Sequence, residues 1–389
     1  MIKMTIIELF DENQMENVVS VLSLKPEKVV FVGFDSVMTS DRKKDIEKFF
    51  KIKGIKLQIE YAIVESDDYQ NILNTLERVF KANEDCIFDL TGGSEMVIMA
   101  MGELSSQNDV PVVQFDIENK KVVKVRKPEA IGECSRTASK ISEHFTLMGG
   151  LKVSNDVWSF SEDFKADIKR IWEACKIGHY VWNKMTPLFA NIDEGGEVVI
   201  DTKEKKQEEI LEALSEKGIL RNFSNKNGIV RFTYKNSQIA KCLTKAGNIL
   251  ELYAYVSALE INERQMGYFS DIDIGVMADW DGVLLDWRQR TKDTKNEIDL
   301  VFMRGAIPVF VSCKNGEVTK EALYELETIS RHLGGKYVTK VLLASYDLDL
   351  TSNRKYVAQR AKDMGIKVVC GIDKMGHEKF LSELMLAAK

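Results

Sequence analysis

The chain has 389 residues, of which 44% are hydrophobic and 29% are charged, and its formal net charge is -6. This length allows two or three domains, and the composition is that of an ordinary globular protein. The negative charge excludes a surface that is basic throughout, as tight non-specific DNA binding would need, but it leaves room for a nuclease with a local basic groove.

Several compositional features narrow the class further. No apolar run reaches membrane-spanning length and the N-terminus lacks a signal-peptide pattern, so we expect no membrane association. The six cysteines are scattered without a CxxC pair, which favours reduced thiols in the cytoplasm over a zinc site or disulfides. The four histidines are isolated, so a bound metal would need oxygen ligands, which favours Mg or Mn.

The first part of the chain alternates strand-like and helix-like segments. We predict strands at residues 5–10, 29–32, 57–63, 86–90 and 110–115, and helices at 12–22, 41–50, 69–80 and 95–104. Residues 122–125 are expected to pair with the last of these strands. This alternation predicts an α/β domain over residues 1–148 with a doubly wound, mostly parallel sheet.

The rhythm breaks in the middle of the chain, at residues 149–245, which we interpret as a connector. It contains a predicted helix at 203–217 and a hairpin at 219–234 that turns at 225–228. A helix followed by a hairpin is typical of a winged helix, which could bind DNA. The alternative is a connector that only packs domains together.

The last part, residues 246–389, is again α/β, with a mixed sheet. Strands are predicted at 268–277, 283–287, 297–302, 307–312, 338–344 and 366–369, and helices at 249–259, 319–332 and 353–364.

A glycine-rich turn, Asp89-Leu90-Thr91-Gly92-Gly93-Ser94, lies between a predicted strand and a helix. Ligands bind at such strand ends in doubly wound sheets, and backbone N–H groups at a helix start favour phosphate. The pattern matches neither GxGxxG nor a Walker lysine motif. A plain turn with Ser94 as helix cap is the alternative. Neighbouring strand ends would add these residues to the same crevice, unless they are ordinary caps: Asp11, Gln14, Gly33, Phe34, Asp35 and Ser36.

Two strand ends in the last part carry acidic and basic side chains. Glu297 and Asp299 are two residues apart on a strand and therefore face the same side. Lys314 follows fifteen residues after Asp299, at the end of an apolar strand. A carboxylate that holds a divalent cation beside a lysine that orients water can build a phosphodiesterase site. A structural ion pair is the alternative.

A basic segment precedes this site. It comprises Arg288, Arg290, Lys292 and Lys295 and adjoins Trp287, so it could contact a nucleic-acid strand or be a solvated loop. We expect Asp271 and Asp273 to be the solvated face of an edge strand rather than part of the acidic cluster.

These motifs resemble known families. The N-terminal pattern with Asp89-Leu90-Thr91-Gly92-Gly93-Ser94 resembles a CRISPR-associated Rossmann fold (CARF) domain, and Asp299 with Ser312-Cys313-Lys314 is similar to PD-(D/E)xK nuclease domains. Together they resemble the CRISPR ancillary nucleases of type III antiviral defence. The resemblance implies a homodimer that binds a cyclic oligoadenylate, with cyclic tetra-adenylate first and cyclic hexa-adenylate second, and then cuts DNA, RNA or both with a metal ion.

The resemblance also assigns roles within the nuclease site. Ser312 stands where the family has an acidic residue, so a second carboxylate must come from Glu297 or from Glu251, which matches an acid on a preceding helix. The backbone carbonyl of Cys313 would be a further metal ligand. We expect Asp299 and Glu251 to hold Mg or Mn and Lys314 to assist the attacking water. Two rivals stay open: a ligand-responsive DNA-binding regulator, and a restriction or repair nuclease without a sensor.

Overall fold

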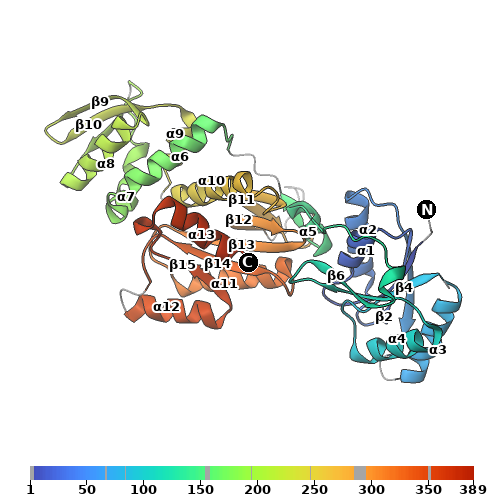
Figure 1. Cartoon of the computed structure of the whole chain (residues 1–389). Helices are drawn as coiled ribbons and strands as arrows, with labels where there is room; N and C mark the ends of the chain where they lie inside the picture. Colours follow the sequence, from blue (N-terminus) through green and yellow to red (C-terminus); the bar gives the residue numbers. More distant parts are fainter. Residues whose placement is uncertain are drawn as a thin grey trace.

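The computed structural model describes residues 4–65, 68–83, 85–153, 158–193, 195–245, 247–283, 295–348 and 352–389. Within these residues it confirms the predicted α/β class. A Rossmann-like, mostly parallel sheet forms the N-terminal domain, a mixed sheet forms the C-terminal domain, and a small antiparallel sheet belongs to the middle of the chain. The N-terminal domain and the small sheet lie on opposite sides of the C-terminal domain (Figure 1).

The N-terminal sheet has the order β3-β2-β1-β4-β5-β6. Its strands are β1 (Thr5–Leu9), β2 (Lys28–Phe34), β3 (Gln58–Val64), β4 (Cys86–Asp89), β5 (Val112–Asp116) and β6 (Lys121–Arg126), and only the β5–β6 pair is antiparallel. Helices α1 (Val19–Leu24) and α2 (Ser40–Ile52) pack on one face, and α3 (Tyr69–Lys81) and α4 (Glu95–Asn108) pack on the other. The strand order reverses between β1 and β4, so the ends of these two strands form a crevice of the kind that binds ligands.

The predicted helix at residues 12–22 is wrong over its first part, because α1 begins only at Val19. In the segment before α1, side chains form hydrogen bonds with backbone groups that a helix would otherwise use. The Asn13 amide donates to Asp11 Oδ1 (2.8 Å), and the Asp11 amide donates to Asn17 Oδ1 (2.7 Å). Such local bonds replace helical ones. They fix Asp11 directly after β1, at the crevice.

The middle segment contains the predicted helix and hairpin, and more. Helix α5 (Ile141–Leu147) precedes the segment, whose elements are β7 (Leu151–Val153), α6 (Glu162–Cys175), α7 (His179–Met185), β8 (Val198–Asp201), α8 (Lys205–Glu216), β9 (Leu220–Lys226), β10 (Ile229–Tyr234) and α9 (Ser237–Leu243). The small sheet has the order β8-β10-β9. Buried side chains of α6 to α9 share one continuous hydrophobic core with the C-terminal domain. The segment is therefore packed onto that domain, and DNA binding by it stays a prediction.

The C-terminal sheet has the order β15-β14-β13-β12-β11-β7, so β7 from the middle segment completes it. The remaining elements are α10 (Asn248–Arg264), β11 (Asp271–Asp279), β12 (Lys295–Arg304), β13 (Ile307–Lys314), α11 (Lys320–Ile329), a single π-helical turn (Ser330–Gly334), β14 (Thr339–Ala344), α12 (Ser352–Asp363), β15 (Ile366–Val369) and α13 (His377–Ala387). Helices α10 and α13 cover one face and α11 the other. Among the described residues, no helix is both long and apolar enough to cross a membrane.

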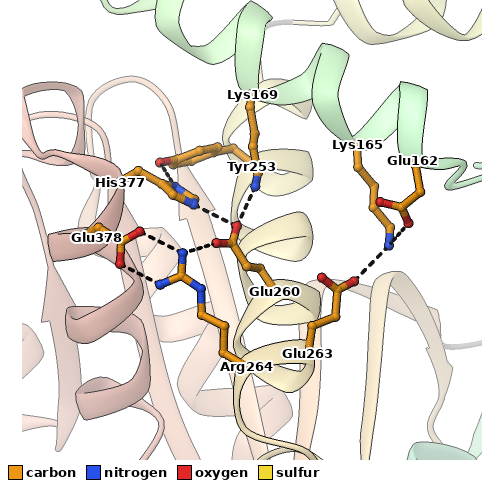
Figure 2. A network of polar contacts seen from close by, with 9 residues as sticks. All are labelled: Glu162, Lys165, Lys169, Tyr253, Glu260, Glu263, Arg264, His377 and Glu378. Atoms are coloured by element: carbon orange, nitrogen blue, oxygen red, sulfur yellow. Dashed lines mark hydrogen bonds and ion pairs between the residues drawn. The ribbon is translucent and has the colours of Figure 1, made fainter.

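A polar network around Glu260 ties α6, α10 and α13 together (Figure 2). The Glu260 carboxylate accepts from Lys169 of α6 (2.5 Å) and bonds His377 Nε2 of α13 (2.8 Å). It also pairs with Arg264, which binds Glu378 in turn (2.6 Å). Burial opposes ionisation of Glu260, but its hydrogen bonds with Lys169 and His377 prevail and lower its pKa to about 2. The network thus clamps the middle segment onto the C-terminal domain.

Helix α5 joins the two large domains. Glu143 pairs with Lys53 of α2 (2.8 Å), while Ile141 and Phe145 enter the core beneath α11. The buried His144 ring bonds through Nε2 to the Leu333 carbonyl of the π turn (2.8 Å). Burial lowers the pKa of His144 to about 4, so this ring is neutral in the folded protein at neutral pH.

His144 should make stability pH-dependent. Its pKa is about 6.5 when unfolded and about 4 when folded, so the unfolded chain binds more protons below pH 6.5 and stability falls as the pH drops towards 4. We expect His144 to account for a loss of about 2 kcal/mol between pH 7 and pH 5. Urea unfolding of wild type and His144→Gln at both pH values measures it. The variant should lose less stability on acidification, whereas the control His332→Gln, which changes an exposed ring, should follow wild type. Equal losses in all three proteins would contradict the assignment.

Candidate active site and ligand crevice

Asp299 and Lys314 lie together, on the neighbouring strands β12 and β13. Lys314 Nζ is 3.9 Å from Asp299 Oδ2. The same oxygen accepts the Cys313 amide (2.6 Å) and the Ser312 hydroxyl (3.3 Å). Among the described residues, no hydrogen-bond partner engages the other oxygen, Oδ1. The carboxylate is thus oriented through one oxygen, and the second is left for a ligand.

The backbone is irregular where Asp299 lies. Ile298 packs in the core beneath α11, whereas Leu300 packs in the core beneath α10, although residues two apart on a regular strand share a face. Opposite them on β11, Gly275 has a φ of +60°, which few other residues adopt. Strand β12 therefore rotates at Asp299. The pairing of β11 with β12 keeps one register across this point, so both strands change face together and no bulge is involved.

Glu251 reaches the same place from the first turn of α10. Burial raises the pKa of Glu251 to about 8, and the nearby carboxylates of Asp299 and Glu297 raise it further, against the opposing effect of Lys314. One carboxyl group of the cluster therefore keeps its proton near neutral pH when no cation is present. The side chain of Cys313 points into the core, and burial raises the pKa of its thiol, so it does not serve as a nucleophile.

The donors at this site fit an oxygen-binding cation. No three histidine, cysteine, aspartate or glutamate side chains converge as a metal cage anywhere in the part of the chain that the structure describes. The site instead offers the carboxylates of Asp299 and Glu251, whose mutual repulsion a cation would relieve. Mg²⁺ is usually held by one or two carboxylates together with water and substrate phosphates.

The other candidate residues of this domain are placed as follows. A small cavity of about 80 Å³ beside α11 is lined by Glu297, Asp299, Ser312 and Lys314, together with Ala322, Glu325, Leu326 and Ile329 of that helix. Lys295 begins β12, while Arg288, Arg290 and Lys292 lie outside the described residues. Asp271 and Asp273 have other partners: Asp271 accepts the Ile141 amide of α5 (2.9 Å), and Asp273 pairs with Lys152 of β7.

A larger crevice of about 660 Å³ opens at the ends of β1, β2 and β4. Five of the predicted residues line it: Asp11, Gly33, Phe34, Gly93 and Ser94. Gly93 has a φ of +80° and donates its amide to Asp11 Oδ2 (2.8 Å). The Ser94 hydroxyl is buried, and no hydrogen-bond partner for it is found among the described residues. Ser94 is the N-cap residue of α4, but its side chain makes no capping bond, so the alternative of a plain turn capped by Ser94 gains no support.

The remaining predicted ligand residues lie around this crevice without lining it. Thr91 is buried, donates to Asp89 Oδ1 (2.6 Å) and accepts the Phe115 amide (2.7 Å). Gly92 faces Glu16 and Asp11, and the buried Gln14 donates to the Arg42 carbonyl (3.0 Å). Asp35 and Ser36 are exposed on the turn after β2.

Sequence reasoning missed one side of the crevice wall. Arg42 comes from α2, Met148 follows α5, and Arg331, Gly335 and Lys336 belong to the C-terminal domain. Arg331 and Lys336 lie more than two hundred residues from the glycine-rich turn in sequence. No local motif marks them, and only the packing of the two domains brings them to the crevice.

Comparisons with known proteins give a fold but no sequence family. No family model and no curated protein matches the chain. The crystal structure of protein VC1899 from Vibrio cholerae superposes with a TM-score of 0.78 at 16% identity, covering 99% of both chains. Can2 from Sulfobacillus thermosulfidooxidans, solved in complex with cyclic tetra-adenylate, superposes with a TM-score of 0.71 at 15% identity, covering 98% of this chain and 97% of Can2. From the first domain to the last, this chain therefore has the fold of VC1899 and Can2.

Proposed function

We propose that this protein is a nuclease of type III CRISPR defence that a cyclic oligoadenylate activates and that requires Mg²⁺ or Mn²⁺ to cut DNA, RNA or both. The observation that carries the proposal is the convergence of Asp299 in the middle of β12, Lys314 at the end of β13 and Glu251 at the start of α10. A DNA-binding regulator would have no need for this convergence, which speaks against that rival.

The residues of the site divide the work as follows. Asp299, held by the Cys313 amide and the Ser312 hydroxyl, would hold the cation together with Glu251. Lys314 donates to a phosphate oxygen or to the attacking water, where its positive charge stabilises charge that develops in the transition state. When bound, the cation would polarise the phosphodiester and make water a better nucleophile. Glu297 lies at the rim, where it can orient water.

The N-terminal crevice is the proposed activator site. Its volume suits a nucleotide ligand, its floor carries the Gly93 turn at a helix start, and the fold is shared with Can2, which binds cyclic tetra-adenylate. A cyclic tetra-adenylate has two-fold symmetry, and a homodimer matches it by presenting the same crevice twice. Cyclic hexa-adenylate has the symmetry as well and is the second candidate. A crevice of this size speaks against a nuclease without a sensor.

A cleavage assay tests the whole proposal. The purified chain is incubated with single-stranded RNA, single-stranded DNA or plasmid, with cyclic tetra-adenylate, cyclic hexa-adenylate or no ligand, and with Mg²⁺, Mn²⁺ or excess EDTA. We expect cleavage when ligand and metal are both present and none in EDTA. Undiminished cutting in EDTA would contradict the metal requirement, and cutting that ignores both ligands would contradict the sensor. Light scattering should give the mass of a dimer.

A further inference from the structure

The crevice in the N-terminal domain is closed on one side by the C-terminal domain of the same chain. The segment after α11 contributes Arg331, Gly335 and Lys336 to its wall. The two cationic side chains are largely exposed, Arg331 at 81% and Lys336 at 65%. Arg331 pairs with Glu327 one turn earlier (2.6 Å), so it is already held within its own domain. Lys336 is held by the other domain.

The partner of Lys336 is a buried carboxylate. Glu16 lies in the turn before α1, its side chain is only 4% exposed, and its Oε1 is 3.2 Å from Lys336 Nζ. The Tyr337 hydroxyl donates to the same oxygen. Glu16 also abuts the glycine-rich turn, because a Cβ placed on Gly92 would be 2.6 Å from its Oε2. One carboxylate thus touches both the turn that we assign to the activator and the C-terminal domain.

The segment that carries Lys336 is continuous with the nuclease site. Helix α11 places Ala322, Leu326 and Ile329 against the cavity beside Asp299 and Lys314. The π turn then runs directly from the end of α11 to the crevice wall. A change in the partner of Lys336 therefore acts at one end of an element whose other end borders the catalytic residues.

We propose that Lys336 is a phosphate-binding residue of the activator site and that it exchanges the Glu16 carboxylate for a phosphate of the bound ligand. The inference rests on the proposed function and adds to it the residue through which the C-terminal domain senses the ligand. The exchange breaks the ion pair between Glu16 and Lys336, which links the two domains. It also leaves Glu16 buried with Tyr337 as its remaining partner, which works against ligand binding, because a buried carboxylate needs its counter-charge. A ligand can shift the arrangement of the domains only if it binds one arrangement more tightly than the other. The contact between Lys336 and the phosphate would supply this difference in affinity.

Calorimetric titration with cyclic tetra-adenylate tests the exchange on four full-length proteins: wild type, Lys336→Met, Glu16→Gln and the double variant. Loss of a charged hydrogen bond to phosphate should weaken binding to Lys336→Met by about 10- to 100-fold. Glu16→Gln removes the competitor and should bind about 3- to 10-fold more tightly. In the Lys336→Met background the same Glu16 change should have no effect. Lys320→Met, which removes an exposed lysine at the start of α11, should match wild type.

Each contrary result has a distinct meaning. Wild-type affinity in Lys336→Met would overturn the exchange and leave the proposed function standing. The exchange would also be overturned if Glu16→Gln raised the affinity for cyclic tetra-adenylate equally with and without Lys336, because Glu16 would then simply repel the ligand. If the wild-type chain does not bind cyclic tetra-adenylate, the proposed activator and the exchange both fail. Melting curves by circular dichroism show that the variants are folded, as the exposure of Lys336 leads us to expect.

Discussion

Asp299→Asn should abolish ligand-activated cleavage, with a loss of at least about 1,000-fold, while binding of the activator stays unchanged. The asparagine keeps the size of the side chain, and its oxygen can still accept the Cys313 amide. What disappears is the negative charge that we assign to the cation and to Lys314, 3.9 Å away. Lys314→Met removes the other partner and should cost about 100- to 1,000-fold.

The assay compares initial cleavage rates at saturating activator and Mg²⁺. Asp273→Asn is the matched control, because Asp273 is also a carboxylate on the C-terminal sheet but pairs with Lys152 of β7 and not with Lys314. It should cleave at the wild-type rate. Activity within a few-fold of wild type in both Asp299→Asn and Lys314→Met would show that the pair is a structural ion pair and that catalysis takes place elsewhere.

Glu251→Gln separates two roles that the sequence left open. Both Glu297 and Glu251 are candidates for the second carboxylate, and periodicity favours neither. We favour Glu251, because it is partly buried, whereas Glu297 is exposed, and because burial and the nearby Asp299 carboxylate raise its pKa to about 8, the expected condition of a cation ligand without its cation. The change should raise the Mg²⁺ concentration needed for half-maximal cleavage, which a magnesium titration measures.

The sequence predicted those parts of the fold that depend on local patterns. The buried run Val29–Val32 became part of β2, and the spacing of Asp299 and Lys314 placed them on neighbouring strands, because strand alternation and hairpin geometry depend on nearby residues. The periodicity of residues 12–18 predicts a helix, but the segment is not helical, because Asn17 bonds the backbone of Asp11 through its side chain. That competition cannot be read from hydrophobic periodicity.

The ligand crevice was predictable only on one side. Gly93 and Ser94 follow a strand and precede a helix, a local signature that sequence carries. Glu16, Arg331 and Lys336 carry no such signature, since their meeting depends on how α5 and the π turn dock two domains. Thr91 shows that a residue within the motif can have a structural role. Its place in the motif suggested a ligand contact, yet its hydroxyl is used to hold β4 against β5.

Gly93→Ala should both destabilise the N-terminal domain and remove the response to the activator. Gly93 has a φ of +80°, and a Cβ placed there would be 2.5 Å from the Cβ of Leu9, which is fully buried in β1. The left-handed backbone and the overpacking together should cost about 2–4 kcal/mol. The turn must then open, which moves the Gly93 amide away from Asp11 and narrows the crevice.

Gly102→Ala is the matched control on the following helix. A Cβ at Gly102 meets nothing within 4 Å, so alanine should stabilise α4 by about 0.5–1 kcal/mol and leave activation unchanged. Urea unfolding gives the two stability changes, which should have opposite signs, and titration with cyclic tetra-adenylate below the unfolding transition gives the binding. If Gly93→Ala is destabilised yet binds and responds like wild type, the turn is structural and the activator lies elsewhere. If it is folded and no longer binds, the amide at the start of α4 is part of the ligand site, because the backbone conformation is the property that the two substitutions change differently.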